Sequence, residues 1–416
     1  MRASPTLCAM NIDAAAAGFS AQRLEKISAH LTDNYLTPGK ISGCQVMVSR
    51  RGVPAYFRSF GLRDLERQTP VTEDTIFRIY SMTKPITSLA LMMLYEEGKF
   101  QLNDPVHRFI PSWRTQRVYV EGQGEGMVTK APDTPATMRH VLTHMSGLTY
   151  GEALYPSDHP ADKRYAELGV NRGKGETIQS FADTLAQVPL RFEPGSQWCY
   201  SLATDVCGCL VEFISGQPFA DFLKERIFDS LGMSDTSFVI DDSRVDRFAA
   251  NYGRRADKSL KLLDDPFDSI YADADRFPSG GGGLISTTRD YARFCEMLRR
   301  GGELDGHRII GSRTLRLMTR NHLPGGVDLA SIAMGSFSET AYEGVGFGLG
   351  FASTLDEVEA ATIGAGDYYW GGAASTIFWV DPVEDLFVIF MTQLMPSATF
   401  NFRGQIKNIV YGAIED

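Results

Sequence analysis

The chain has 416 residues, of which 43% are hydrophobic and 22% are charged, and its formal net charge is −10. This composition is typical of a globular protein and excludes a largely disordered chain, while the length favours two interlocked lobes. The negative charge and the scattered Lys and Arg residues argue against nucleic acid as a partner.

Residues 1–19 contain Pro5, Asn11 and Asp13, which interrupt the apolar segment that an export signal requires. We interpret them as a flexible N-terminal arm. Nowhere does the sequence approach the ~20 consecutive apolar residues that cross a bilayer. We therefore expect a soluble, cytoplasmic protein that has no membrane partner.

An amphipathic helix is predicted over residues 20–35, with Ser20 as its N-cap. Two segments typical of strands follow at residues 44–50 and 55–60. The residues between them, Arg51-Gly52-Val53-Pro54, are typical of a turn, so the pair is predicted to form a β-hairpin.

Ser81-Met82-Thr83-Lys84 precedes a run of apolar residues at helical spacing that Gly98 ends. With Ser81 as N-cap and Pro85 in the first turn, Ser81 and Lys84 share one face of the helix, so the amine can reach the hydroxyl. The helix N-terminus lowers the pKa of the amine, and its free N–H groups can hold an oxyanion. The motif alone is weak evidence, because one Ser-x-x-Lys is expected by chance, but its chemistry favours acyl transfer.

From residue 98 to about 345 the chain is predicted to be mainly helical, with helices at residues 138–144, 178–187, 203–215, 219–231, 289–299 and 313–321. Gly216 and Gly232 stand where C-terminal caps are expected. Strands are predicted at residues 348–354, 375–380 and 386–392, and a last helix at residues 401–414.

Strands at both ends of the chain can pair into one antiparallel sheet. We therefore expect an α/β (α+β) fold in which an antiparallel sheet is flanked by helices. Residues 20–97 and 346–416 would form a discontinuous α/β lobe, and residues 98–345 an inserted, mainly helical lobe. A cleft is expected where the two lobes meet.

Tyr200 lies in a turn that leads into a predicted helix, a position from which a phenol can point into a cleft. A tyrosine near a lysine can pass on a proton and so protonate a leaving alkoxide. The alternative is a half-buried tyrosine that only packs.

Trp370-Gly371-Gly372-Ala373 precedes the apolar strand that ends at residue 380. Two glycines here indicate that another backbone or a ligand comes close, and such a segment can supply a backbone N–H to an oxyanion hole. A bulge or a tight bend is the alternative.

Other catalytic arrangements fit the sequence poorly. It has no Gly-x-Ser-x-Gly and no phosphate-binding loop. His140 and His144 have the spacing of a metal pair, but the glutamate of a zincin is missing between them, so we interpret both as structural. The cysteines are too few and too scattered for a disulfide framework, and we treat all six as small apolar residues: Cys8, Cys44, Cys199, Cys207, Cys209 and Cys295. We predict no metal and no cofactor.

The order of Ser81-x-x-Lys84, Tyr200 and a glycine-bearing strand near residue 370 resembles the serine β-lactamase and penicillin-binding-protein superfamily, and within it most closely the family VIII carboxylesterases. The resemblance covers roughly residues 20–414. It includes the segments Phe77-Arg78-Ile79-Tyr80, Leu102-Asn103-Asp104-Pro105-Val106, Leu142-Thr143-His144-Met145-Ser146-Gly147-Leu148, Phe192-Glu193-Pro194-Gly195 and residues 279–284.

This resemblance implies a β-lactamase/transpeptidase-like fold. It also implies that Ser81 is the acylated nucleophile, Lys84 its base and Tyr200 a proton relay. The backbone N–H groups of Ser81 and Ala373 would form the oxyanion hole, and no cofactor is implied.

Two departures from class C β-lactamases bear on the substrate. This chain has Tyr200-Ser201-Leu202 in place of Tyr-x-Asn, and Trp370-Gly371-Gly372 in place of Lys-Thr-Gly. The missing amide and amine would hydrogen-bond an acylamino side chain and offset a substrate carboxylate.

We therefore expect a carboxylesterase that acts on a neutral, small-molecule ester with a short or medium acyl chain. Trp370, Gly371 and Gly372 would form an apolar substrate-binding wall. A β-lactamase or D-Ala-D-Ala peptidase, an acyltransferase or amide hydrolase, and a catalytically silent binding protein are the alternatives. The sequence carries no signal for an oligomeric state.

Overall fold

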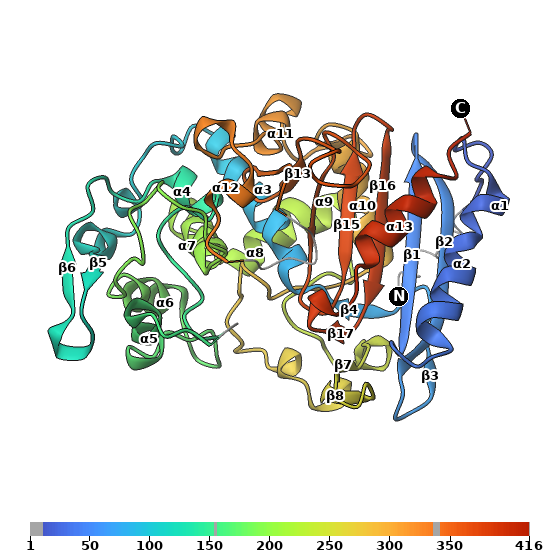
Figure 1. Cartoon of the computed structure of the whole chain (residues 1–416), viewed down its shortest axis with the longest axis horizontal. Coiled ribbons are helices and arrows are strands. Elements are labelled where there is room, and N and C mark those ends of the chain that lie inside the picture. The colour runs from blue at the N-terminus through green and yellow to red at the C-terminus, as the bar shows by residue number, and fades with distance from the viewer. Residues whose placement is uncertain (1–10, 154–155, 336–341, 416) are drawn as a thin grey trace, which may run out of the picture.

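The computed structural model describes residues 11–153, 156–335 and 342–415. Its largest element is an eight-stranded antiparallel sheet in the order β12-β13-β14-β15-β16-β1-β2-β3 (Figure 1). The strands are β1 (Gly43–Arg50), β2 (Val53–Asp64), β3 (Thr69–Pro70), β12 (Val345–Phe347), β13 (Ala352–Thr354), β14 (Tyr368–Gly371), β15 (Ile377–Asp381) and β16 (Leu386–Thr392).

The two ends of the chain meet in this sheet. β1 pairs with β16 from Cys44 opposite Thr392 to Arg50 opposite Leu386, and it pairs with β2 on its other side. Every residue of β1 and β16 is buried, as expected for central strands that are covered on both faces. The predicted joint antiparallel sheet, and the hairpin within it, are confirmed.

Helices cover both faces of the sheet. Phe378 of β15 contacts Tyr291 of α10 (Thr288–Arg299), with ring centroids 5.1 Å apart. Phe390 of β16 contacts Phe402 of α13 (Phe402–Tyr411) at 4.8 Å. Phe378 is paired with Ile389, the neighbour of Phe390, so the two phenylalanines point to opposite faces. Helices α1 (Ala21–Leu24) and α2 (Lys26–Leu31) lie beside α13 (Figure 1).

A helical group adjoins the sheet, and α3 (Thr83–Glu96) stands at its centre. Every residue of α3 from Thr83 to Leu94 is buried, which makes it a core helix and not a surface helix. It packs against α7 (Ala203–Ser215). Around α7 lie α4 (Met138–Leu142), α6 (Ile178–Leu185) and α8 (Phe219–Leu223), and the further helices are α5 (Pro160–Glu167), α9 (Asp229–Leu231), α11 (Ser312–Met318) and α12 (Leu329–Ile332).

Small sheets occur between the helices, where the sequence analysis predicted no strand. In two of them, residues far apart in the chain pair, so no local pattern signals the pairing, and the other two are short hairpins. They are β4 (Ile76–Arg78) with β9 (Ile285–Thr287), β5 (Val118–Glu121) with β6 (Val128–Lys130), β10 (Glu303–Leu304) with β11 (His307–Arg308), and the group of β7 (Asn251–Arg254), β8 (Leu260–Asp264) and β17 (Leu394–Met395).

Several predicted elements differ in detail from the structure. The helix predicted at residues 20–35 is divided into α1, α2 and a π-turn at Thr32–Leu36, although Ser20 does cap its start. A π-turn at Lys224–Phe228 likewise separates α8 from α9. The strand predicted at residues 348–354 is instead the end of the β12–β13 hairpin. Gly216 and Gly232 do form left-handed C-caps.

The flexible arm predicted for residues 1–19 is wrong for its second half. Ala17 and Phe19 are buried, and Phe19 forms a β-bridge with Ile414. The backbone N–H of Asp13 also donates to the Pro54 carbonyl at 2.9 Å. Pairing with a distant segment fixes this region, and its own sequence does not show that contact. Residues 1–10 lie outside the described part of the chain.

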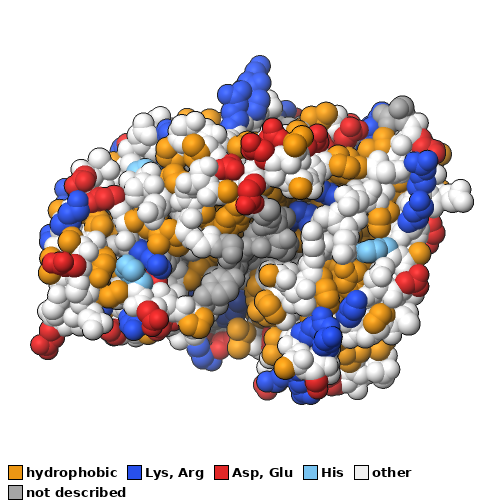
Figure 2. All heavy atoms as spheres, in the orientation of Figure 1, with side chains coloured by type: hydrophobic (Ala, Val, Ile, Leu, Met, Phe, Trp, Pro, Cys, Tyr) orange, Lys and Arg blue, Asp and Glu red, His pale blue; other side chains and the backbone are white. Residues whose placement is uncertain are grey.

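The lobe boundaries stay a prediction, with one qualification. Helix α10 belongs to the segment assigned to the helical lobe, yet it packs against β1, β15 and β16. The inserted segment therefore also contributes to the cover of the sheet. On the face shown in Figure 2, Lys and Arg side chains are interspersed with Asp and Glu.

No single helix among the described residues is long and apolar enough to cross a bilayer. Helices Ala203–Ser215 and Phe219–Leu231, which meet at a bend of 86°, satisfy the criteria of length and hydropathy only as a pair. The five described cysteines are buried and free of disulfides, consistent with their interpretation as apolar residues, and Cys8 lies outside the described residues.

The buried N-terminal segment leads to a stability prediction. Phe19→Ala should lower the free energy of unfolding by about 3–5 kcal/mol, because Phe19 is 3% exposed and its removal leaves a cavity. Phe267→Ala is the control: Phe267 is 52% exposed and should cost about 1 kcal/mol or less. Urea denaturation followed by tryptophan fluorescence measures both. Equal effects would mean that residues 13–19 do not stabilise the fold.

Candidate active site

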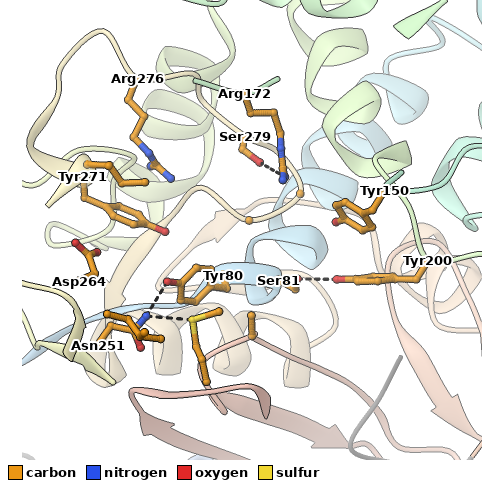
Figure 3. A pocket seen from close by; sticks show the side chains of 16 residues that line it. Tyr80, Ser81, Tyr150, Arg172, Tyr200, Asn251, Asp264, Tyr271, Arg276 and Ser279 are labelled. Atoms are coloured by element: carbon orange, nitrogen blue, oxygen red, sulfur yellow. Dashed lines mark hydrogen bonds between the residues drawn. The ribbon is translucent and has the colours of Figure 1, made fainter. Parts of the chain in front are cut away.

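A cleft of about 530 Å³ contains Ser81. Its wall comes from the turn before α3, the segment before α7, the loop before β9, the small β7–β8–β17 sheet and the turn after β14 (Figure 3). The residues that line it include Ser81, Tyr150, Arg172, Tyr200, Arg276 and Ala373.

Ser81 does not cap the helix as predicted. It lies in a 3-10 turn at Tyr80–Met82, and α3 begins only at Thr83 with no side-chain cap. The preceding Tyr80 has φ +41, a left-handed conformation that is strained for a non-glycine residue. The Ser81 hydroxyl is thereby available to the cleft.

Lys84 reaches Ser81 from the first turn of α3, as its spacing predicted. Its Nζ donates to Ser81 Oγ at 3.2 Å, to Tyr150 Oη at 2.9 Å and to the Gly281 carbonyl at 2.6 Å. The side chain is buried, and burial lowers the pKa of Lys84 to about 7. The Asp205 carboxylate raises this pKa, and the Arg172 guanidinium lowers it. A substantial share of the amine is therefore neutral near pH 7.

Tyr200 completes the group around Ser81. Its hydroxyl donates to Ser81 Oγ at 2.6 Å (Figure 3). Lys84 Nζ lies 4.4 Å from the centroid of the Tyr200 ring. Burial raises the pKa of Tyr200, so this residue is a protonated phenol at neutral pH. The structure thus brings together Ser81, Lys84 and Tyr200, which the sequence analysis had selected.

Tyr150 is a residue of this site that the sequence analysis did not identify. It accepts a hydrogen bond from Lys84 and donates one to Tyr200, so it links the amine to the phenol. Tyr150 follows the Leu142–Leu148 segment of the family resemblance by two residues, which is the one signal that pointed to it.

Asp205 holds the segment whose carbonyl contacts Lys84, and the sequence analysis did not identify this residue either. Its Oδ1 accepts hydrogen bonds from Ser279 Oγ and from the Gly281 N–H. These contacts place the Gly281 carbonyl against Lys84 Nζ. A Cβ at Gly281 would lie 2.5 Å from Asp205 Oδ2, so only glycine fits there. The glycine at position 281 thus lets Asp205 pack closely against the segment whose carbonyl contacts Lys84.

Ala373 lines the cleft together with Ser81, as an oxyanion hole made from their N–H groups requires. It lies in the turn between β14 and β15. A Cβ at the neighbouring Gly372 would lie 2.4 Å from the Ile79 carbonyl, two residues before Ser81. The predicted close approach of another backbone is therefore confirmed at Gly372.

The predicted apolar wall differs from the structure. Trp370, Gly371 and Gly372 are not among the described residues that line the cleft. Trp370 is buried behind Tyr200, with ring centroids 5.5 Å apart. Side chains on a strand point alternately to its two faces, and the Trp370 indole lies on the face that packs against Tyr200. The indole therefore supports Tyr200 from behind and does not face the cleft.

The two histidines are engaged in packing and hydrogen bonding. His144 is buried, and its Nδ1 lies 3.1 Å from Ser201 Oγ. His140 Nδ1 accepts from the Thr137 N–H at the start of α4. In the part of the chain that the structure describes, no three His, Cys, Asp or Glu side chains are placed to hold a metal ion.

Comparison with known proteins identifies the family. The family model described as Beta-lactamase matches residues 29–408. The chain belongs to the β-lactamase family. The resemblance to the serine β-lactamase and penicillin-binding-protein superfamily, and the α/β fold that it implies, are thereby confirmed.

Three relatives illustrate the similarity. Protein Rv1367c of Mycobacterium tuberculosis is 32% identical over 86% of this chain and 87% of its own length. Esterase EstB of Burkholderia gladioli is 31% identical over 93% of this chain and 94% of its own length. The structure of EstCE1, described as a hydrolase with promiscuous acyltransferase activity, has a TM-score of 0.78 and 30% identity, covering 94% of this chain and 99% of EstCE1. Together with the family match, they make this chain a serine hydrolase or acyltransferase of the β-lactamase fold.

The charges around Lys84 predict how its reactivity depends on pH. A neutral amine activates Ser81, so the rate at which a fluorophosphonate labels Ser81 should rise with pH through about 7. Asp205→Asn removes the carboxylate that raises the Lys84 pKa, so this rise should move to lower pH. Labelling reactions that are stopped at fixed times, at pH values between 5 and 9, measure this shift in the pH profile.

Asp241→Asn is the matched control, because Asp241 is an exposed carboxyl that pairs with Arg244. It should leave the pH profile in place. A profile that stays fixed or moves to higher pH in Asp205→Asn would contradict the assigned influence of Asp205 on Lys84.

Proposed function

We propose that this protein hydrolyses carboxylic esters with short or medium acyl chains through an acyl-enzyme on Ser81. The observation that carries the proposal is the convergence of two hydrogen-bond donors on Ser81 Oγ, from Lys84 at 3.2 Å and from Tyr200 at 2.6 Å. A serine held between an amine of lowered pKa and a protonated phenol has both the base and the acid that acyl transfer needs.

In the first step, neutral Lys84 accepts the Ser81 proton while Oγ bonds to the ester carbonyl carbon. The backbone N–H groups of Ser81 and Ala373 would stabilise the oxyanion that forms. Tyr200 then gives its phenolic proton to the leaving alkoxide. The hydrogen bonds from Lys84 to Tyr150 and from Tyr150 to Tyr200 offer a route by which the lysine proton restores the phenol.

In the second step, water attacks the acyl carbon and loses a proton to the same Lys84–Tyr150–Tyr200 chain. The bond between the acyl carbon and Ser81 Oγ breaks, and Oγ recovers a proton. The carboxylic acid leaves, Ser81 is regenerated, and each of the three side chains again holds its starting proton.

An ester substrate is supported by the contents of the cleft and by the relatives. Leu263, Ile270 and Met395 provide apolar lining, which suits an acyl chain. EstB, named as an esterase, matches nearly the whole chain. The absent Tyr-x-Asn amide and strand lysine weaken the case for a β-lactam or a D-Ala-D-Ala peptide. We therefore favour the family VIII carboxylesterase branch.

Acyl transfer to an alcohol is the second candidate. EstCE1 is described as a hydrolase with promiscuous acyltransferase activity, and an acyl-enzyme can be attacked by an alcohol as well as by water.

The main prediction concerns the three residues of the relay. Ser81→Ala should abolish turnover of p-nitrophenyl butyrate and labelling by a fluorophosphonate. Lys84→Met and Tyr200→Phe should each lower kcat by about 10²–10⁴-fold, the usual contribution of general acid–base groups. Tyr95→Phe, in the same helix as Lys84 but away from the cleft, should leave the rate unchanged. Circular dichroism checks the fold of each variant.

Turnover by Ser81→Ala would remove Ser81 as the nucleophile. If the wild-type protein neither turns over any ester nor binds the fluorophosphonate, it is the catalytically silent binding protein. Faster turnover of nitrocefin than of esters would instead favour the β-lactamase alternative.

A separate experiment distinguishes hydrolysis from transfer. With p-nitrophenyl butyrate and increasing 1-butanol, release of nitrophenol should continue while butyrate remains the main product. Chromatography measures the ratio of butyl butyrate to butyrate. A ratio above one at low alcohol concentration would make acyltransferase the better description.

A further inference from the structure

We propose that the cleft contains a carboxylate-binding subsite formed by Arg276, and that the preferred acyl group carries a terminal carboxylate. The substrate class would be half-esters of dicarboxylic acids. This inference rests on the proposed function of Ser81, and it replaces the neutral substrate that the sequence analysis favoured.

The first observation is the charge of the cleft. Its charged lining residues are Arg172, Asp264 and Arg276. The Asp264 carboxylate is already paired, because Arg78 donates to it from Nε at 2.5 Å. The lining is therefore cationic overall, although the whole chain has a net charge of −10. A cationic recess in an acidic protein concentrates anions near the nucleophile.

The second observation is the bonding of Arg276. Its Nη1 donates to the carbonyls of Phe238 at 3.0 Å and Gly283 at 2.9 Å, and its guanidinium carbon lies 3.8 Å from the centroid of the Tyr271 ring. These contacts fix the orientation of the side chain. Among the described residues, no carboxylate pairs with Arg276, and no acceptor is bonded to its Nε or Nη2. Nε and Nη2 together form the edge that binds a carboxylate through two parallel hydrogen bonds.

Arg172 differs from Arg276 in this respect. Its Nη1 lies 3.5 Å from Asp205 Oδ2 and 3.4 Å from Ser279 Oγ, so Asp205 partly neutralises its charge. Arg276 is therefore the stronger candidate for an anionic ligand. Arg172 would add to the positive potential along the path between Arg276 and Ser81.

The third observation is the direction in which the acyl chain of the ester would extend from Ser81. In Figure 3, Tyr150 and Tyr200 lie on one side of Ser81, and Tyr271, Asp264 and Arg276 lie on the other. If Tyr200 protonates the leaving oxygen, the alcohol departs on the side of Tyr200. The acyl chain then extends toward Arg276. The anionic group therefore belongs to the acyl part of the ester and not to the alcohol.

A pair of esters with matched shapes tests the subsite. One is the 4-methylumbelliferyl half-ester of adipic acid, which ends in a carboxylate. The other is 4-methylumbelliferyl 6-methylheptanoate, which has an isopropyl group in the same place and no charge. The measured quantity is the ratio of kcat/KM for the charged ester to kcat/KM for the neutral ester.

Arg276→Gln should lower this ratio by about tenfold or more, the effect of one charge-assisted hydrogen bond. Arg276→Lys should lower the ratio less, because the positive charge remains while the pair of parallel hydrogen bonds from Nε and Nη2 is lost. Arg276 also supports the Phe238 and Gly283 carbonyls, and damage to that support would slow both esters equally and leave the ratio unchanged. The control Arg313→Gln, on the exposed side of α11, should not alter the ratio.

An unchanged ratio in Arg276→Gln overturns the proposal. So does a ratio that falls in Arg172→Gln but not in Arg276→Gln.

If Arg276→Gln does not fold, competitive inhibition of the wild-type protein by monomethyl adipate replaces it. Inhibition at least about tenfold stronger than that by dimethyl adipate, and weakened by added NaCl, supports the subsite, and equal inhibition overturns it. Failure to hydrolyse either ester would refute the proposed function instead, while hydrolysis of the neutral ester alone would refute only the subsite.

Discussion

The burial of Lys84 is the constraint on which the site depends. An exposed lysine would be an ammonium at neutral pH and no base, whereas burial lowers the pKa of Lys84 to about 7. This lowered pKa has a cost in stability. Below pH 7 the amine is protonated in both folded and unfolded chains, so the folded state bears the full cost of a buried charge. As the pH rises from 7 toward 10.5, the ordinary pKa of a lysine, the unfolded chain still holds the proton while the folded chain has lost it, and the cost disappears. The fold therefore gives up stability at neutral pH for reactivity.

The groups around Lys84 reduce the free-energy cost of burying its charged form. Nζ has three acceptors, Ser81 Oγ, Tyr150 Oη and the Gly281 carbonyl, so a protonated amine would be fully hydrogen-bonded. The Asp205 carboxylate stands behind this shell and favours the charged form, while Arg172 opposes it. The pKa near neutrality is thus a balance between burial and two opposite charges. Glycine at position 281 is part of the balance, because a side chain there would separate Asp205 from the lysine.

Sequence reasoning found the parts of this site that depend on local spacing. Ser81 and Lys84 lie three residues apart, and helical geometry alone brings them together. That strands from both ends of the chain join one antiparallel sheet was also predictable, because strand-like segments stand at both ends with helices between them. Tyr150 and Asp205 were missed because their contacts join segments 66 to 76 residues apart. Arg276 was missed because its hydrogen bonds go to backbone carbonyl groups, which no residue pattern shows. Ser81 was wrongly assigned as a helix cap because the strained turn at Tyr80 delays α3, and no local pattern shows such a turn. Trp370 was placed on the wrong side of its strand, since composition does not tell which face of β14 the indole takes.

The position of the cations explains how one cleft can hold both an anion and a base. An anion beside Arg172 would cancel the field that lowers the Lys84 pKa, and the amine would become harder to deprotonate when substrate bound. Arg276 is not among the charges that shift the Lys84 pKa. A carboxylate at Arg276 would therefore be neutralised locally and would leave the lysine largely unaffected. In this chain the strand lysine of class C β-lactamases is replaced by Trp370, which packs against Tyr200. A cation on the opposite wall, farther along the acyl path, lets the enzyme recognise charge without disturbing the proton transfer at Ser81.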